Sequence, residues 1–270
     1  MSRTNLCGRA VIKNTDQGCE KMRVISLQVK IHDNRTQMGE TAATDVAAAM
    51  KALGEKQDTI TMTFAAAPSQ DDFLAALSAI PGVPWEKVVA FHLDEYLELP
   101  RGHANSFETY LNAHLFDAVK PGKVMLVADM AGTAQEKADA YEALLREHGG
   151  IDIACIGVGE NGHIAFNEPG SDFHTPRWCD LITIDDKSVQ QQFRDYKDHP
   201  NPEARYATLE DVPRNAITMT IPSICAAKQI FCIVPAQPKA EAIKAALEGP
   251  ISNTCPASAL RTHPDTIMYL

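Results

Sequence analysis

Short β-rich runs alternate with helical segments along nearly the whole 270-residue chain, and this order constrains the fold more than any other feature. The strand-like run at 59–64 precedes a helical pattern at 71–80, and Ile153–Ile156 is an apolar run typical of a buried strand. No break in composition divides the pattern. Such alternation predicts an α/β fold: a doubly wound, mostly parallel, Rossmann-like sheet in a single domain, with helices on both faces.

The other predicted elements follow the same order. Strands are expected at 24–31, 85–93, 124–127, 180–184, 216–221, 229–234 and 266–270. Helices are expected at 41–53, 133–148, 188–196, 224–227 and 239–247, with another that ends near Phe116. Residues 1–22 show no sustained period and are predicted to be a flexible N-terminal extension, which leaves 23–270 as the domain. The polar segment 198–211 is predicted to be an exposed loop or lid.

The charge balance limits the partners of the protein. With 25 Lys and Arg against 35 Asp and Glu, the net charge is −10, which argues against a nucleic acid or an anionic membrane as partner. No apolar run is long enough to span a bilayer, and the N-terminus lacks the apolar core of a signal peptide, so we expect a cytoplasmic protein. The seven cysteines include no C-x-x-C pair, so neither a disulfide framework nor a zinc site is expected.

A glycine-rich polar loop follows the predicted strand Ile153–Ile156. Glycines at 157, 159 and 162 interrupt regular structure and let the backbone come close to a ligand. The same loop carries polar side chains, several of which can exchange protons: Glu160, Asn161, His163, Asn167 and Glu168. Open α/β sheets bind ligands at the carboxyl ends of their strands. We therefore predict a site here, against the simpler interpretation of a tight turn with solvated side chains.

Three more strand ends carry small or polar residues. The stretch 65–69, Ala-Ala-Ala-Pro-Ser, joins a strand to a helix; it suits an anion at the helix N-terminus and equally suits close packing. Asp94 follows the strand at 85–93, where burial would raise its pKa and suit it to be a general base. Lys239 begins a later helix. Because the carboxyl ends of parallel strands share one edge, these loops predict one pocket for a small phosphorylated or anionic substrate. Neither a nucleotide-binding motif nor a metal-ligand cluster is present.

Three runs resemble the glucosamine-6-phosphate deaminase family. They are FHLDEYLELP at 91–100, GVGENGHIAFNEPG at 157–170 and ALEG at 246–249, and the similarity extends from about residue 31 to residue 270. The related 6-phosphogluconolactonases share the fold but usually differ after the loop histidine. The resemblance implies conversion of glucosamine 6-phosphate and water to fructose 6-phosphate and ammonia, without a metal ion or an organic cofactor.

The resemblance also implies roles for four catalytic side chains. Asp94 matches the base that removes the C2 proton of the opened sugar to give a cis-enolamine. His163 matches the histidine that moves the ring-oxygen proton as the pyranose opens, and Glu168 matches the residue that holds or tunes it. The third ring-opening position, often Asp in the family, is Asn161 here. Since an amide cannot carry the charge of Asp, Glu168 is expected to bear more of that work.

The phosphate end of the site departs from the family pattern. Ser69 matches a hydroxyl of the phosphate loop and Lys239 the phosphate-binding lysine, while Ala67 lies in a loop that is Gly- and Thr-rich elsewhere in the family. Gln192 stands where better-known members place a phosphate-binding arginine, with Arg194 near it in the sequence. Losing a charged bidentate donor weakens phosphate binding by about 1.5–3 kcal/mol if nothing replaces it. The reaction type is therefore better determined than the substrate.

Simpler interpretations remain open for single residues. Lys239 could be solvated, Glu168 could only shape a turn, His163 could be an ordinary loop histidine, and 190–192 could be an exposed helix face. Two other functions also remain: a 6-phosphogluconolactonase-type sugar-lactone hydrolase and a non-catalytic sugar-phosphate sensor. The expected partner is a small-molecule amino-sugar phosphate. A homo-oligomer is compatible with the sequence, which determines neither the amino-sugar epimer nor an allosteric effector.

Overall fold

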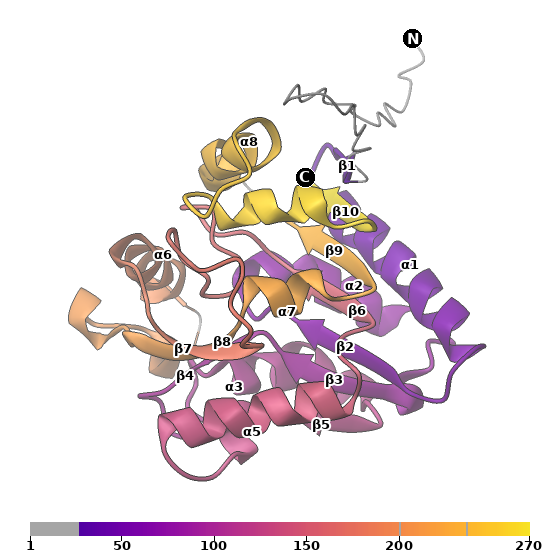
Figure 1. Ribbon diagram of the computed structural model, residues 1–270, viewed down its shortest axis with the longest axis horizontal. Coiled ribbons are helices and arrows are strands. Elements are labelled where there is room, and N and C mark those ends of the chain that lie inside the picture. Colours follow the sequence, from indigo (N-terminus) through magenta and orange to yellow (C-terminus); the bar gives the residue numbers. More distant parts are fainter. Residues whose placement is uncertain (1–26, 200, 236) are drawn as a thin grey trace.

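The computed structural model describes residues 27–199, 201–235 and 237–270 (Figure 1). The predicted N-terminal extension, 1–22, and the first residues of the strand predicted at 24–31 lie outside the described residues.

A seven-stranded sheet, in which all neighbouring strands are parallel, forms the centre of the molecule (Figure 1). Its strand order is β1-β10-β9-β6-β2-β3-β5. The strands are β1 Gln28–Lys30, β2 Ile60–Phe64, β3 Val88–His92, β5 Lys123–Met125, β6 Ile153–Ile156, β9 Gln229–Ile233 and β10 Thr266–Tyr269. From β2 the next strands of the chain, β3 and β5, extend the sheet in one direction. From the neighbouring β6 the later strands, β9 and β10, extend it in the opposite direction, so the strand order reverses between β2 and β6. The predicted doubly wound α/β fold is confirmed.

Helices cover both faces of this sheet (Figure 1). They are α1 Arg35–Gly54, α2 Asp71–Ala79, α3 Phe107–Leu111, α4 Asp117–Val119, α5 Ala134–Glu147, α6 Asp186–Lys197, α7 Ile221–Cys225 and α8 Ala240–Glu248, with a π-helical turn, Asn112–Phe116, between α3 and α4. Local caps determine where helices start. The side chain of Asn34 accepts the N–H of Gln37, so α1 begins before the apolar pattern that predicts it. Thr133 and Glu136 form a reciprocal capping box at α5.

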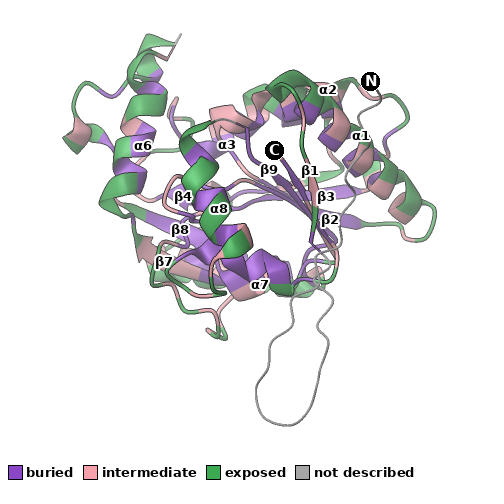
Figure 2. Ribbon diagram, turned by 90° about the horizontal axis from the view of Figure 1, so that it is seen from above, coloured by how far each residue is buried: buried purple, intermediate pink, exposed green. Residues whose placement is uncertain are grey.

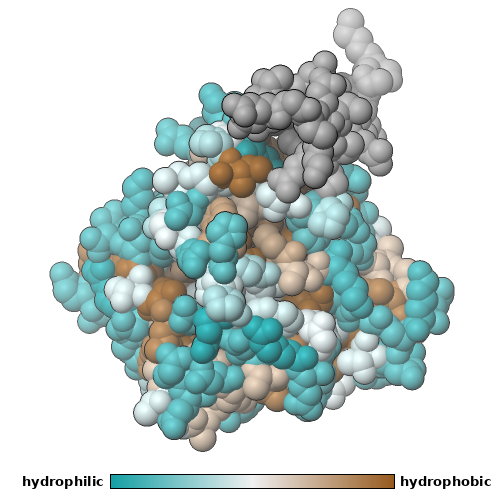
Figure 3. Space-filling view, viewed as in Figure 1, coloured by the Kyte–Doolittle hydropathy of each residue, from teal (hydrophilic) through white to brown (hydrophobic). Residues whose placement is uncertain are grey.

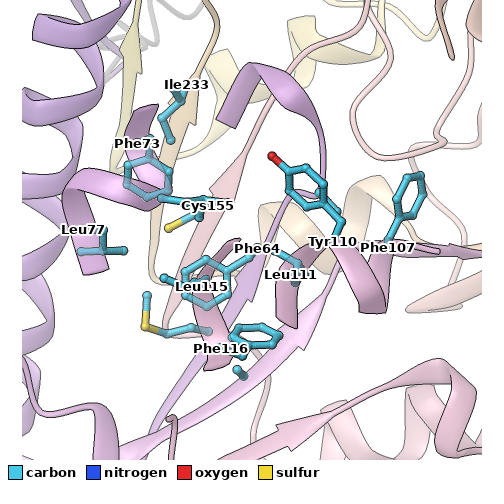
Figure 4. Close-up of a cluster of buried hydrophobic side chains, with 14 of the residues drawn as sticks. Phe64, Phe73, Leu77, Phe107, Tyr110, Leu111, Leu115, Phe116, Cys155 and Ile233 are labelled. Atoms are coloured by element: carbon cyan, nitrogen blue, oxygen red, sulfur yellow. The ribbon is translucent and has the colours of Figure 1, made fainter. Parts of the chain in front are cut away.

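Alternate residues of the central strands pack into two apolar layers, one on each face of the sheet. In β6 the side chains of Ile153 and Cys155 face one layer, and those of their sequence neighbours face the other. Figure 4 shows part of the first layer, where Phe64 of β2 meets Phe116 with ring centroids 5.9 Å apart. Buried positions gather on the strands and on the helix faces turned toward them (Figure 2). Burying a Phe or Leu side chain fully contributes about 1.5–3 kcal/mol to stability. Because both faces of these strands are covered, side chains on both faces gain this energy, and the strands read as continuous apolar runs.

A second, three-stranded antiparallel sheet stands beside the first, in the order β4-β8-β7. Its strands are β4 Asp94–Tyr96, β7 Cys179–Thr183 and β8 Asn215–Met219. The sequence predicts strands at 180–184 and 216–221, but it does not predict that they form a separate sheet. Nor does it predict that Asp94 opens a strand and pairs with Thr218. Such pairing joins segments far apart in the sequence, which local periodicity does not reveal.

The described part of segment 198–211 is only partly the exposed loop that the sequence predicts. Most of its side chains are exposed, but Ala204 and Tyr206 are buried. The ring of Tyr206 also meets the ring of Tyr196 edge to face, with centroids 6.0 Å apart. The Tyr206 contact packs the segment against the end of α6.

Hydrophilic side chains cover most of the molecular face in Figure 3, and hydrophobic ones occur there in small separate groups. Among the described residues, the exposed large hydrophobic side chains are Ile31 and Ile251. None of the helices in the described ranges combines the length and the apolar character needed to cross a membrane.

Candidate active site

A cleft opens at the carboxyl ends of β2, β3, β6 and β9, where the strand order reverses. Open α/β sheets bind their ligands at such a switch point. The cleft holds about 490 Å³ of empty space, including the part open to solvent. Its walls are the loops after these four strands, together with Phe107 of α3 and Gln191 and Gln192 of α6.

The structure brings all eight predicted site residues to this cleft or directly behind it. Six of them line it: Ala67, Ser69, Asp94, His163, Gln192 and Lys239. Asn161 and Glu168 lie behind the imidazole of His163 and are hydrogen-bonded to each other. The residues come from four strand ends and from α6, so the convergence expected of parallel strand ends is present.

Asp94 opens β4, and its half-buried carboxylate faces the cleft. None of the described residues donates a hydrogen bond to this carboxylate. Its pKa is raised well above the ordinary value, first by burial and then by the negative charges of Glu95 and Glu168. Because strand residues alternate, Glu95 points away from the cleft, where it accepts three backbone N–H groups, two of them from the start of α3. These bonds anchor β4 and so hold Asp94 at the cleft.

Two glycines allow the loop that carries His163 to close on itself. The N–H of Gly159 donates to the carbonyl of His163 at 2.9 Å, and the N–H of Gly162 donates to the carbonyl of Gly159 at 3.0 Å. Gly162 has a φ of +86°, a backbone conformation that favours glycine. A Cβ atom at residue 159 would lie 2.0 Å from the His163 ring. Only glycine at 159 therefore leaves room for the imidazole at the cleft wall.

A buried polar network holds the side of the imidazole turned away from the cleft. Nδ1 of His163 lies 2.9 Å from Oγ of Ser188 on α6 and 3.6 Å from Oε2 of Glu168. Asn161 donates from Nδ2 to Glu168 at 2.7 Å and accepts the backbone N–H of His163 at 3.1 Å. Burial acts to raise the pKa of Glu168, but the neighbouring His163, Ser188 and Asn161 hold it below the ordinary value. The Glu168 carboxylate therefore stays ionised, and Nε2 of the imidazole is left for a ligand.

The other polar residues of this loop are used within the protein. Asn167 donates to the carbonyls of Ile164 and Met219 and so ties the loop to the end of β8. Glu160 forms an ion pair with Arg194 of α6. Arg194 is exposed and does not line the cleft.

Lys239 supplies the positive charge of the cleft. It is 9% exposed, and burial lowers its pKa, with the charge of Asp195 acting in the opposite direction. Among the described residues the Lys239 ammonium has no ion-pair partner. Ser69 and the buried Gln192 line the same cleft. These side chains can bind an anionic group, with an amide where the family has a guanidinium.

Ser188 and Gln191 are site residues that the sequence analysis does not identify. The simpler interpretation of 190–192 as an exposed helix face is wrong. Only Gln190 is exposed, and the other two glutamines are buried. Buried positions of α6 recur three or four residues apart: Ser188, Val189, Gln191, Gln192 and Tyr196. This helical spacing is the sequence pattern from which the inward face could have been predicted.

The fold and the cleft define the class: a doubly wound α/β protein with a small-molecule site in which a carboxylate faces an imidazole–carboxylate pair. The family model described as glucosamine-6-phosphate isomerases/6-phosphogluconolactonase matches residues 33–268. The chain belongs to this family, and the resemblance stated from its sequence is confirmed.

Two curated relatives, both named glucosamine-6-phosphate deaminase, come from Exiguobacterium sibiricum and Bacillus thuringiensis. They are 39% identical over 183 residues and 36% identical over 179 residues, which cover 68% and 66% of this chain and 68% and 63% of the relatives. A solved structure of a monomeric glucosamine-6-phosphate deaminase has a TM-score of 0.79 at 27% identity, covering 89% of this chain and 95% of the other. A 6-phosphogluconolactonase from Thermotoga maritima, with a TM-score of 0.69 at 17% identity and coverage of 90% and 98%, shares the fold.

Proposed function

We propose that this protein is an enzyme that converts glucosamine 6-phosphate and water to fructose 6-phosphate and ammonia. The observation that carries the proposal is that Asp94 and His163, remote in sequence, line one cleft, with Glu168 behind the imidazole. The relatives named glucosamine-6-phosphate deaminase support this reaction over other chemistry of the family.

The first step opens the sugar ring. The phosphate binds at the end of the cleft that holds Lys239 and Ser69, which leaves the ring between Asp94 and His163. Nε2 of His163 takes the proton of the C1 hydroxyl and returns it to the ring oxygen as the bond between C1 and that oxygen breaks. The ionised Glu168 stabilises the transient imidazolium.

The second step moves the C2 proton. Asp94 removes it while the C1 oxygen takes a proton from solvent, which gives an enolamine with a double bond between C1 and C2. Return of a proton to C1 gives the C2 imine, and addition of water at C2 with loss of ammonia gives the ketose. The raised pKa makes the ionised Asp94 carboxylate a stronger base, and nothing among the described residues occupies its lone pairs.

The substrate in this proposal is a small amino-sugar phosphate, bound without the arginine used by better-known family members. With Gln192 in its place, phosphate affinity depends on Lys239 and on hydrogen bonds from neutral groups. A phosphorylated hexosamine does not cross a membrane unaided, so the proposal keeps the cytoplasmic location predicted from the sequence. A homo-oligomer stays a prediction.

The proposal is tested by measuring ammonia release from gluco and galacto amino-sugar 6-phosphates, with the unphosphorylated sugars as controls. We expect turnover of glucosamine 6-phosphate and incorporation of one solvent deuterium at C1 of the product. Hydrolysis of 6-phosphogluconolactone without carbon-bound deuterium would assign the lactonase reaction instead. Binding of the sugar phosphates without any turnover would assign the sensor function.

A further inference from the structure

The hydroxyl of Ser188 is directed at the imidazole of His163 instead of at its own helix. Ser188 lies in the first turn of α6, is 1% exposed, and has Oγ 2.9 Å from Nδ1 of His163. Helical serines commonly bond a carbonyl of the preceding turn, as Ser78 of α2 does with Ala75. Nor does Ser188 cap α6, because the cap is the side chain of Asp185. The position of this hydroxyl is therefore explained by the site and not by the helix.

The distances show what surrounds Nδ1 of His163. This nitrogen lies 2.9 Å from Oγ of Ser188, within hydrogen-bond distance, and 3.6 Å from Oε2 of Glu168, so its hydrogen bond is to the serine. The negative charge of the Glu168 carboxylate beside Nδ1 favours the neutral ring that carries its proton on this nitrogen. The serine oxygen then accepts the proton on Nδ1. This direction leaves Nε2 without a proton on the side of the cleft.

We infer that Ser188 is a positioning residue that accepts a hydrogen bond from Nδ1 of His163 and, beside the Glu168 carboxylate, holds the neutral imidazole in the tautomer with its proton on Nδ1. The assignment rests on the proposed function for its effect on turnover, but the tautomer is a property of the protein without substrate. Asn161, which replaces the more usual Asp of the family, adds no charge to the network, so Ser188 supplies the contact to Nδ1.

The test is Ser188→Ala, with Ser78→Ala as the matched control because Ser78 is a helical serine that does not line the cleft. Nitrogen-15 NMR of His163, assigned with His163→Gln, is recorded on the full-length protein without ligand. We expect the Nδ1–H tautomer in the unchanged protein and in Ser78→Ala, and a mixture of tautomers in Ser188→Ala. Turnover of glucosamine 6-phosphate by Ser188→Ala should fall about tenfold in kcat/KM, the order of one lost hydrogen bond.

A second variant and a binding probe separate the role of Ser188 from folding and from the proposed function. Ser188→Thr keeps the hydroxyl and should restore the single tautomer. Binding of a linear 2-amino-2-deoxyhexitol 6-phosphate, which needs no ring opening, should be unchanged in Ser188→Ala. A single Nδ1–H tautomer in Ser188→Ala, or full activity with mixed tautomers, overturns the inference. An unchanged protein that deaminates no amino-sugar phosphate overturns the proposed function and leaves the tautomer measurement valid.

Discussion

Asp94 and Glu95 illustrate how adjacent residues of one strand take opposite tasks. Asp94 faces the cleft without a hydrogen-bond donor among the described residues, while Glu95 accepts three backbone N–H groups on the other side of β4. Burial raises the pKa of both carboxyl groups, that of Glu95 to about 7. The difference in their hydrogen bonds, and not in their pKa, makes one a candidate base and the other an anchor.

Replacing Asp94 with Asn should abolish turnover and preserve binding. The amide has the same size but cannot take the C2 proton, so we expect kcat to fall by about 10³-fold or more. The affinity for the linear hexitol phosphate, measured by calorimetry, should stay within about threefold. Asp117→Asn, at an exposed site on α4, is the control. An active Asp94→Asn enzyme would falsify the assignment of the base.

Gly159 lies against the ring of His163, so a methyl group added there tests how the imidazole is positioned. In Gly159→Ala the added Cβ would lie 2.0 Å from the ring, so the imidazole must move. Displacement of a catalytic group by about 1 Å costs about 10²-fold, and we expect a loss of that order in kcat/KM. Gly102→Ala, where nothing lies within 4 Å and φ is +74°, should cost stability without lowering activity. Equal activity of the two variants would contradict this account.

At the scale of elements, α3 holds the alanine-rich loop between β2 and α2. The hydroxyl of Tyr110 lies 2.6 Å from the carbonyl oxygen of Ala67 and also contacts Asp71. His114 stacks on the Tyr110 ring at 4.1 Å and lies 3.2 Å from Asp71. Figure 4 shows the Tyr110 side chain on α3, beside the cluster of buried hydrophobic side chains. The loop that bounds the anion end of the cleft thus depends on a helix about forty residues later in the chain.

Removing the Tyr110 hydroxyl should therefore affect binding more than chemistry. In Tyr110→Phe the loop loses a hydrogen bond of about 1 kcal/mol, and we expect KM for the sugar phosphate to rise about fivefold with kcat unchanged. Steady-state kinetics at fixed pH measure both constants. Ser78→Ala, on the outer part of α2, should alter neither. A fall in kcat with KM unchanged would show that Tyr110 does not act through the loop.

For the whole molecule, buried ionisable groups link stability to pH in opposite directions. Burial lowers the pKa of His92 to about 4, so its contribution is complete above its unfolded pKa of 6.5 and is lost as the pH falls from 6.5 toward 4. Burial raises the pKa of Glu95 from 4.5 to about 7, so its contribution is present below pH 4.5 and is lost as the pH rises toward 7. The two residues lie on either side of the turn from β3 to β4.

His92→Gln isolates the first of these contributions. Glutamine can still accept the N–H of Val127, which His92 accepts at 2.9 Å, but it does not titrate. We compare the unfolding free energy of the unchanged protein with that of His92→Gln. The difference should become about 3 kcal/mol less favourable to the unchanged protein between pH 7 and pH 4. Urea unfolding at several pH values measures this difference. A difference that is independent of pH would contradict the neutral buried state of His92.

Much of this architecture follows from local pattern. The apolar run of β6 identifies a strand covered on both faces, and the glycines after it identify a loop that approaches a ligand. Parallel strand ends share one edge, so Asp94, His163 and Lys239 could be assigned to one cleft before their positions were known. The strand prediction succeeds because periodicity and composition are properties of neighbouring residues. The prediction of one cleft succeeds because the carboxyl ends of parallel strands meet at one edge in every doubly wound sheet.

Other features came only from the tertiary structure. That Asp94 begins a strand of a second sheet depends on β8, more than a hundred residues later in the chain. That Ser188 meets His163, and that Tyr110 holds Ala67, depends on how helices dock against loops. Each of these contacts is a hydrogen bond or a strand pairing between distant segments, and its geometry is set by the packing of the whole chain. Local periodicity and composition therefore do not predict these contacts.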